Sequence, residues 1–172
     1  GDHVLTERDV VERPEFPDAV AFGGWNLDDH APLGFFDDAH PPSTHTHIPG
    51  LYNIPLRCLY SRTVPNLFFA GRNISATHVA LTSVRVMLTC AQMGEAAGAA
   101  AAQCVREDVT PRELAHDAER LHRLQERLLR DDHYLVNRRR ADPADLALGA
   151  RVSARASSQL EGVSHEHADC AL

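Results

Sequence analysis

Acid–base chemistry is indicated first by a histidine that directly follows two carboxylates. Asp28, Asp29 and His30 lie in a stretch rich in glycine, proline, aspartate and histidine, from Gly23 to Pro49. Neutral imidazole is the usual general base near neutral pH, and a neighbouring carboxylate can orient it. We therefore treat His30 as a candidate base, the alternative being a polar loop histidine.

A strand, a loop and a helix between Asn66 and Ala102 have the parts of a site for an electron-rich ligand. The apolar run Leu67–Ala70 stops at Gly71, which predicts a strand buried on both faces that ends where the backbone can approach a ligand. A helix is predicted from Ser83 to about Val105, capped by Thr82 or Ser83. The unpaired N–H groups and the dipole of its first turn favour an anion or a carbonyl oxygen there.

Two features of this predicted helix call for partners. Arg85, in the first turn, is a cation that opposes the dipole, so we expect a compensating anion, either a carboxylate or the substrate. Gly94 and Gly98 lie four residues apart, which predicts the close approach of another helix or a sheet. Roughly the same side of the helix carries Ala91, Ala97 and Ala101.

A second helix is predicted from Thr110 to about Asp131. Thr110 is its N-cap, Pro111 its first residue and Glu113 the third, which is a capping box with proline in its favoured place. An apolar stripe along it indicates a face in the core. The stripe consists of Leu114, Leu121, Leu124, Leu128 and Leu129.

Charge and hydropathy disfavour two classes of function. The formal net charge of −7 disfavours nucleic-acid binding, because phosphate contacts need a basic surface. The most apolar long run, Val84–Val105, contains Arg85 and Glu95 and predicts no membrane span.

Histidine and cysteine usage does not predict a metal site. His40, His45 and His47 are of metal-ligating type, but prolines surround them and no matching Cys or His cluster follows, so we predict a solvated loop. Cys90 and Cys104 fall within an apolar helical pattern, where a free thiol is usually a small core residue.

Four motifs form a set: PNLFFAGR (65–72), SATH (75–78), SVR (83–85) and MGEAAG (93–98). Taken together they resemble the C-terminal flavin-contacting segment of the FAD-dependent oxidoreductase family, in the two-dinucleotide-binding-domain flavoprotein group. Further similar segments are GGWNLDDH (23–30), YNIPLRCL (52–59) and LQERLL (124–129), so the resemblance covers roughly residues 1–135. The set is specific as a whole, whereas each piece alone is weak.

The resemblance implies FAD as cofactor, hydride transfer to or from the flavin, and a small-molecule substrate. It implies an α/β fold: the C-terminal part of an FAD-binding Rossmann-like flavoprotein with part of its substrate domain, ending in a helical hairpin. The residues implied for cofactor binding are Gly71, Arg72, Ser75, Ser83, Val84 and Arg85, the last three through backbone N–H groups. For catalysis the resemblance adds His78 to His30.

Three segments are expected: 1–60 as part of a substrate or cap domain, 61–137 as the C-terminal part of the FAD-binding domain, and 138–172 as a linker and the truncated start of a further β module. A flavoprotein of this kind needs a G-x-G-x-x-G turn for the pyrophosphate. The sequence contains no such motif. We therefore expect a fragment that contributes to a flavin site without completing it, the motif having preceded Gly1.

Two alternatives to an enzyme follow from the chain as a whole. The segment Asp145–Ser158 resembles the opening strand of discoidin-like, carbohydrate-binding β-sandwiches. On that view the chain is a non-catalytic fragment of a multidomain protein with a carbohydrate-binding module; a sugar-like substrate would suit both functions. A third hypothesis is a fragment that only packs against its missing half.

Overall fold

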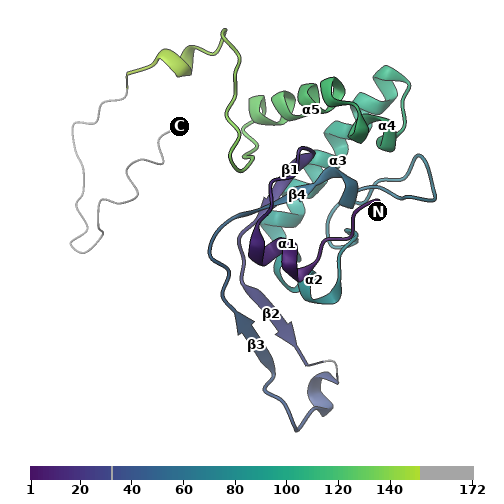
Figure 1. Cartoon of the computed structure of the whole chain (residues 1–172), viewed down its shortest axis with the longest axis vertical. Helices are drawn as coiled ribbons and strands as arrows, with labels where there is room; N and C mark the ends of the chain where they lie inside the picture. The colour runs from purple at the N-terminus through teal and green to yellow at the C-terminus, as the bar shows by residue number, and fades with distance from the viewer. Residues whose placement is uncertain (32, 152–172) are drawn as a thin grey trace. The chain divides into compact units, whose positions relative to one another are not determined.

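The computed structural model describes residues 1–31 and 33–151 (Figure 1). By its internal contacts the chain divides into two compact units, 1–141 and 142–172. The described part of the second unit contains a 3-10 helix, η3 (Leu146–Gly149). Residues 152–158, the second half of the segment that resembles a discoidin-like strand, lie outside the described residues, so that resemblance stays a prediction.

The first unit mixes short strands with helices, which confirms the α/β class in its coarse form. In chain order the elements are α1 (Glu7–Glu12), β1 (Ala19–Gly23), β2 (Leu27–His30), η1 (Gly34–Phe36), β3 (Ser43–Thr46), β4 (Tyr52–Pro55), η2 (Leu56–Cys58), α2 (His78–Val84), α3 (Met87–Glu107), α4 (Pro111–His116) and α5 (Ala118–Arg130). The described strands form two antiparallel pairs, β1–β4 and β2–β3. The parallel sheet of a Rossmann-like domain is not among the described sheets, so that detail stays a prediction.

The core is built on the β1–β4 pair. Ala21 pairs with Ile54 and Gly23 with Tyr52. Helices α3 and α5 pack on β1, and α1 packs on β4 (Figure 1). All of β4 is therefore buried, including Pro55, which ends the strand.

The helices after α3 follow the sequence closely. Thr110 and Glu113 form the predicted capping box, with the Glu113 carboxylate accepting from the Thr110 N–H at 2.7 Å. The predicted second helix is interrupted at Asp117, whose side chain accepts from two N–H groups and so starts α5. Of the leucine stripe, the buried members are Leu114, Leu121, Leu124 and Leu128. The helical hairpin itself stays a prediction.

The strand predicted at Leu67–Ala70 is wrong. Leu67 is 45% exposed, and Ala70 is exposed as well. The segment pairs only locally, because the Phe69 N–H donates to the Leu59 carbonyl at 2.8 Å and the Ser61 N–H to the Leu67 carbonyl at 2.9 Å. The apolar run is thus an extended partner of residues 59–61 rather than a central strand.

The helix predicted to start at Ser83 is also wrong at its beginning. Thr77 caps α2, which ends at Val84, and α3 starts only at Met87. The Thr82 hydroxyl donates to the Val79 carbonyl at 2.7 Å within α2, so it is not a cap. The C-terminal end is near the prediction, at Glu107.

One face of α3 is open on the described chain. An ideal Cβ placed on Gly94 or Gly98 meets no atom within 4 Å. The same helix exposes Leu88, Ala91, Gly98 and Val105. The close packing predicted for the two glycines is therefore not made by the described residues. As a separate finding, none of the described helices is long and apolar enough to span a membrane.

Candidate functional site

The start of α3 presents unpaired backbone donors. Val86 is its N-cap, with extended backbone (φ −68°, ψ 147°). The Cys90 N–H donates to the Val86 carbonyl at 3.0 Å. The N–H groups of residues 87–89 precede this bond and so have no partner within the helix. The end of the helix dipole that favours negative charge is therefore at residues 87–89.

This position corrects the predicted backbone donors. Ser83 and Val84 are buried in the last turn of α2. The Arg85 N–H donates to the Leu81 carbonyl at 3.1 Å. Residues 83–85 therefore do not start a helix, and the N–H groups without a partner in α3 belong to residues 87–89.

Arg85 occupies a place that suits its charge. It is the C-cap of α2, where the helix dipole favours a cation rather than opposing it. Its guanidinium donates to the Asp28 carbonyl at 2.9 Å and lies 3.5 Å from Asp28 Oδ2. The compensating anion expected for Arg85 is thus a carboxylate from β2.

Gly71 and Arg72 lie against the first turn of α3. Gly71 has φ +123°, which L residues rarely adopt, and a Cβ there would lie 3.7 Å from Cys90 Cβ. Burial raises the pKa of the Cys90 thiol, and the charge of Arg72 partly offsets this. The loop after the apolar run and the start of α3 therefore meet.

The β2–β3 ribbon holds His30 beside the Asp28 carboxylate. His30 Nε2 lies 3.4 Å from Asp28 Oδ2. His45, which pairs with Asp28 across the ribbon, has its Nδ1 3.5 Å from Asp28 Oδ1. Both imidazoles are exposed, whereas the carboxylate is largely buried. The structure thus adds His45 to the predicted Asp–His pair.

His78 belongs to a separate pair. It is the first residue of α2, and its Nε2 lies 3.1 Å from Asp29 Oδ1. Successive side chains of a strand point to opposite faces. Asp28 and Asp29 therefore hold His30 and His78 on different faces of β2, and the structure does not bring the two histidines into one pair.

Two serines of the predicted cofactor set have structural partners. Ser83 Oγ lies 2.6 Å from Tyr52 Oη and also donates to the Trp25 carbonyl. Burial raises the pKa of Tyr52 to about 12, so its hydroxyl is neutral at physiological pH. Ser75 Oγ accepts from the Gly1 nitrogen at 2.8 Å. Both hydroxyls serve the packing of the chain.

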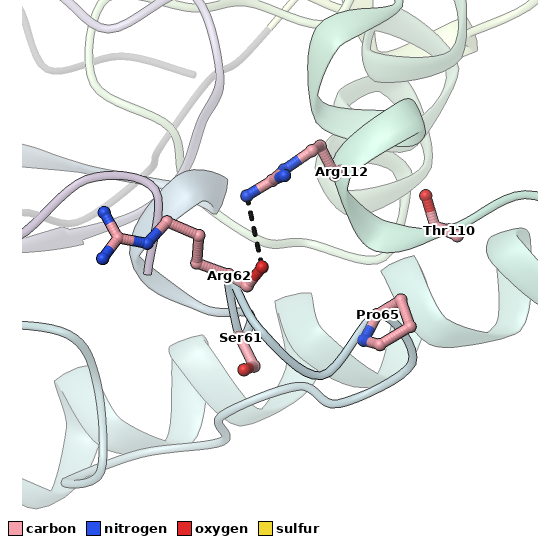
Figure 2. A pocket seen from close by; sticks show the side chains of 5 residues that line it. All are labelled: Ser61, Arg62, Pro65, Thr110 and Arg112. Carbon is pink, nitrogen blue, oxygen red and sulfur yellow. Dashed lines mark hydrogen bonds between the residues drawn. The ribbon is translucent and has the colours of Figure 1, made fainter.

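A cavity of about 80 Å³ lies elsewhere, between the 61–65 loop and α4 (Figure 2). The residues that line it are Ser61, Arg62, Pro65, Thr110 and Arg112. Figure 2 shows the Arg62 guanidinium directed away from the cavity, while Arg112 donates to the Arg62 carbonyl at 3.4 Å. Arg112 is also paired with Asp2. The cavity is therefore bounded by groups that hold the loop to α4.

Sequence reasoning missed three features of this region: the cap of α2, the start of α3 and the place of His45. Thr77, followed by a helical run, was the available signal for the first. No local signal marks residues 85–86 as a break. Across residues 1–31 and 33–151, no three ligand-type side chains gather as a metal site would require.

A comparison with protein families shows the family to which the chain belongs. A family model described as FAD dependent oxidoreductase matches residues 1–128, which include the β2–β3 ribbon, Gly71 and all of α3. No curated protein and no solved structure matches the chain. The chain therefore belongs to the FAD-dependent oxidoreductase family, and its cofactor is FAD.

Proposed function

We propose that this chain supplies the flavin-facing part of an enzyme that transfers hydride between FAD and a small, sugar-like substrate. The observation that carries the proposal is the meeting of Gly71 with the first turn of α3 at Cys90. A backbone without a Cβ and a helix start with unpaired N–H groups together suit the electron-rich edge of a flavin ring.

The residues at the start of α3 fit the cofactor. Met87 and Leu88 are 86% and 80% exposed, so they offer an apolar surface for a planar ring. The N–H groups of residues 87–89 would hold the pyrimidine edge, with Gly71 and Arg72 beside them. FAD, when bound, supplies the atom that accepts or donates the hydride. Arg85 makes no contact with the flavin in this arrangement; it donates to the Asp28 carbonyl and so fixes the β2–β3 ribbon beside the start of α3.

The open face of α3 supports the proposal that the chain is one part of a larger flavoprotein. Ala91, Gly98 and Val105 recur every seven residues along α3 and are exposed. No G-x-G-x-x-G turn occurs in the sequence. We infer that a dinucleotide-binding half packs on this face, with Gly94 and Gly98 allowing the close approach, and that it supplies the pyrophosphate site.

We assign His30 as the general base that accepts the proton of the substrate. Its imidazole is exposed and lies beside the Asp28 carboxylate. A base oriented in this way accepts the proton that an alcohol or amine loses when hydride leaves its carbon. His78, beside Asp29, is the second candidate to face the substrate.

The test is to purify the full protein that contains this chain and measure bound FAD. Gly71→Val should abolish FAD binding, because valine rarely adopts φ +123°. The matched control is Gly34→Ala, which also forces an L residue into positive φ but meets no atom within 4 Å, and it should retain FAD.

A second pair of variants covers the case in which Gly71→Val does not fold. Leu88→Glu is a change at an exposed residue, so the chain should fold, but a carboxylate beside an electron-rich ring edge should lower FAD occupancy at least about tenfold. Leu146→Glu, at a residue that is 90% exposed, should retain FAD. If the full protein holds no flavin, or if both glutamate variants hold it equally, the proposal fails.

A further inference from the structure

The Asp28 carboxylate is the common partner of three basic side chains. Its Oδ2 lies 3.5 Å from Arg85 Nη2 and 3.4 Å from His30 Nε2. Its Oδ1 lies 3.5 Å from His45 Nδ1, yet this oxygen is buried and makes no hydrogen bond. Buried acceptors in folded proteins nearly always have a donor. The His45 nitrogen is placed to become that donor through a small rotation of its ring.

The pairing of the ribbon places these groups on one face. Asp28 pairs with His45, and His30 with Ser43. Because alternate residues of a strand share a face, all four side chains project from the same side of the ribbon. On that side, Ser43 Oγ lies 3.2 Å from His45 Nε2. The face therefore carries a chain of polar groups that runs from His30 through Asp28 and His45 to Ser43.

We propose that Asp28 is a positioning residue that fixes the tautomers of His30 and His45 and thereby makes Nδ1 of His30 the proton acceptor. This inference rests on the proposed function. An ionised carboxylate only accepts, so each nitrogen that faces it carries hydrogen, and neutral imidazole carries one hydrogen only. His30 is then protonated on Nε2 and His45 on Nδ1. The Ser43 hydroxyl donates to the remaining acceptor, Nε2 of His45.

The arrangement selects substrates with an alcohol or amine group on a carbon that bears hydrogen. The O–H or N–H proton of such a group moves to His30 Nδ1. The electron pair left on oxygen or nitrogen would form the new double bond to carbon, and the C–H electron pair would leave as hydride, which bound FAD would accept. The imidazolium formed on His30 is stabilised by the Asp28 charge. The Arg85 guanidinium also faces Asp28, whereas Asp29 and its partner His78 lie on the opposite face of β2.

The experiment is ¹⁵N NMR of the histidine rings in the full 172-residue chain, recorded at alkaline pH where imidazole is neutral. Protonated and unprotonated ring nitrogens have distinct shifts, and His30→Gln and His45→Gln assign the signals. We expect hydrogen on Nε2 of His30 and on Nδ1 of His45. Asp28→Ala should return both rings to the tautomer mixture of free imidazole.

The chain offers a matched control in the pair His40–Asp37, whose atoms Nδ1 and Oδ1 are 2.9 Å apart. Asp37→Ala should change the His40 signals and leave His30 and His45 as they are. A second variant covers the case in which Asp28→Ala disturbs the ribbon. Ser43→Ala removes only the hydroxyl beside His45 Nε2 and keeps Asp28, so His45 should retain its hydrogen on Nδ1 in that variant. Hydrogen on Nε2 of His45, or unchanged rings in a folded Asp28→Ala chain, would overturn the inference. Absence of flavin from the full protein would overturn only the proposed function, since these tautomers need no cofactor.

Discussion

Replacement of Asp18 by alanine should cost the fold a large part of its stability. Asp18 is 3% exposed and accepts three hydrogen bonds from Arg57, from its backbone N–H at 3.0 Å, Nε at 2.9 Å and Nη2 at 3.0 Å. Removing one partner of a buried ion pair costs about 3–5 kcal/mol. The Arg57 side chain is 30% exposed. Water therefore reaches the guanidinium, and we expect about 2–3 kcal/mol.

The assay is urea unfolding of the chain at neutral pH, with the free energy of unfolding taken by linear extrapolation. The matched control is Glu12→Ala, which removes the exposed Arg8–Glu12 pair and should leave the free energy of unfolding unchanged within error. In a chain that already carries Asp18→Ala, the further loss of stability from Arg57→Ala should be smaller than the loss from Arg57→Ala in the original chain, because either substitution alone removes the same ion pair. If Asp18→Ala is no more destabilising than Glu12→Ala at unchanged m-value, the reasoning is refuted.

Three further predictions use the same chain. Tyr52→Phe should cost about 1 kcal/mol in urea unfolding, because its partner Ser83 keeps the Trp25 carbonyl as acceptor; an unchanged stability would contradict this. Gly98→Leu should leave this chain as stable or up to about 1 kcal/mol more stable, yet lower the FAD content of the full protein, since the added side chain meets nothing here; retained FAD would remove the packing argument. Burial raises the pKa of Asp9, but hydrogen bonds from Thr6 and His3 outweigh it and leave the pKa below its usual value. The stability from Asp9 is then complete above about pH 4 and lost as the pH falls through the lower folded pKa; in acid titrations followed by circular dichroism, Asp9→Asn should flatten this part of the curve.

Helix starts that depend on neighbouring residues are within reach of sequence reasoning, as at Thr110 and also at Thr77, whose cap was missed, whereas those that depend on distant residues are not. The cap at Thr110 was predicted because Thr110, Pro111 and Glu113 determine it among themselves. Thr82 and Ser83 also look like caps, but the Ser83 hydroxyl is bonded to Tyr52, which lies 31 residues away in sequence. Hydroxyls used in this way are not available to cap a helix.

The same distinction holds for the apolar run and for the site. Leu67–Ala70 has the composition of a central strand, yet its pairing partner is the short segment 59–61, a choice that composition does not encode. The Asp28–His30 contact was within reach of sequence reasoning because it spans two residues of one strand. His45 joins it only through the register of β2 with β3, and that register follows from the folded ribbon.

The contact between Gly23 and Tyr52 has a consequence for how relatives of this chain vary. A Cβ at position 23 would lie 2.2 Å from Tyr52 Oη. That hydroxyl reaches Ser83, which in turn bonds the Trp25 carbonyl just after the glycine. Substitutions at positions 23, 52 and 83 are therefore coupled. A relative with a side chain at position 23 needs a smaller residue at position 52. Without the tyrosine hydroxyl, that relative no longer needs a hydroxyl at position 83. In an alignment, these three columns should covary although 60 residues of chain separate the first from the last.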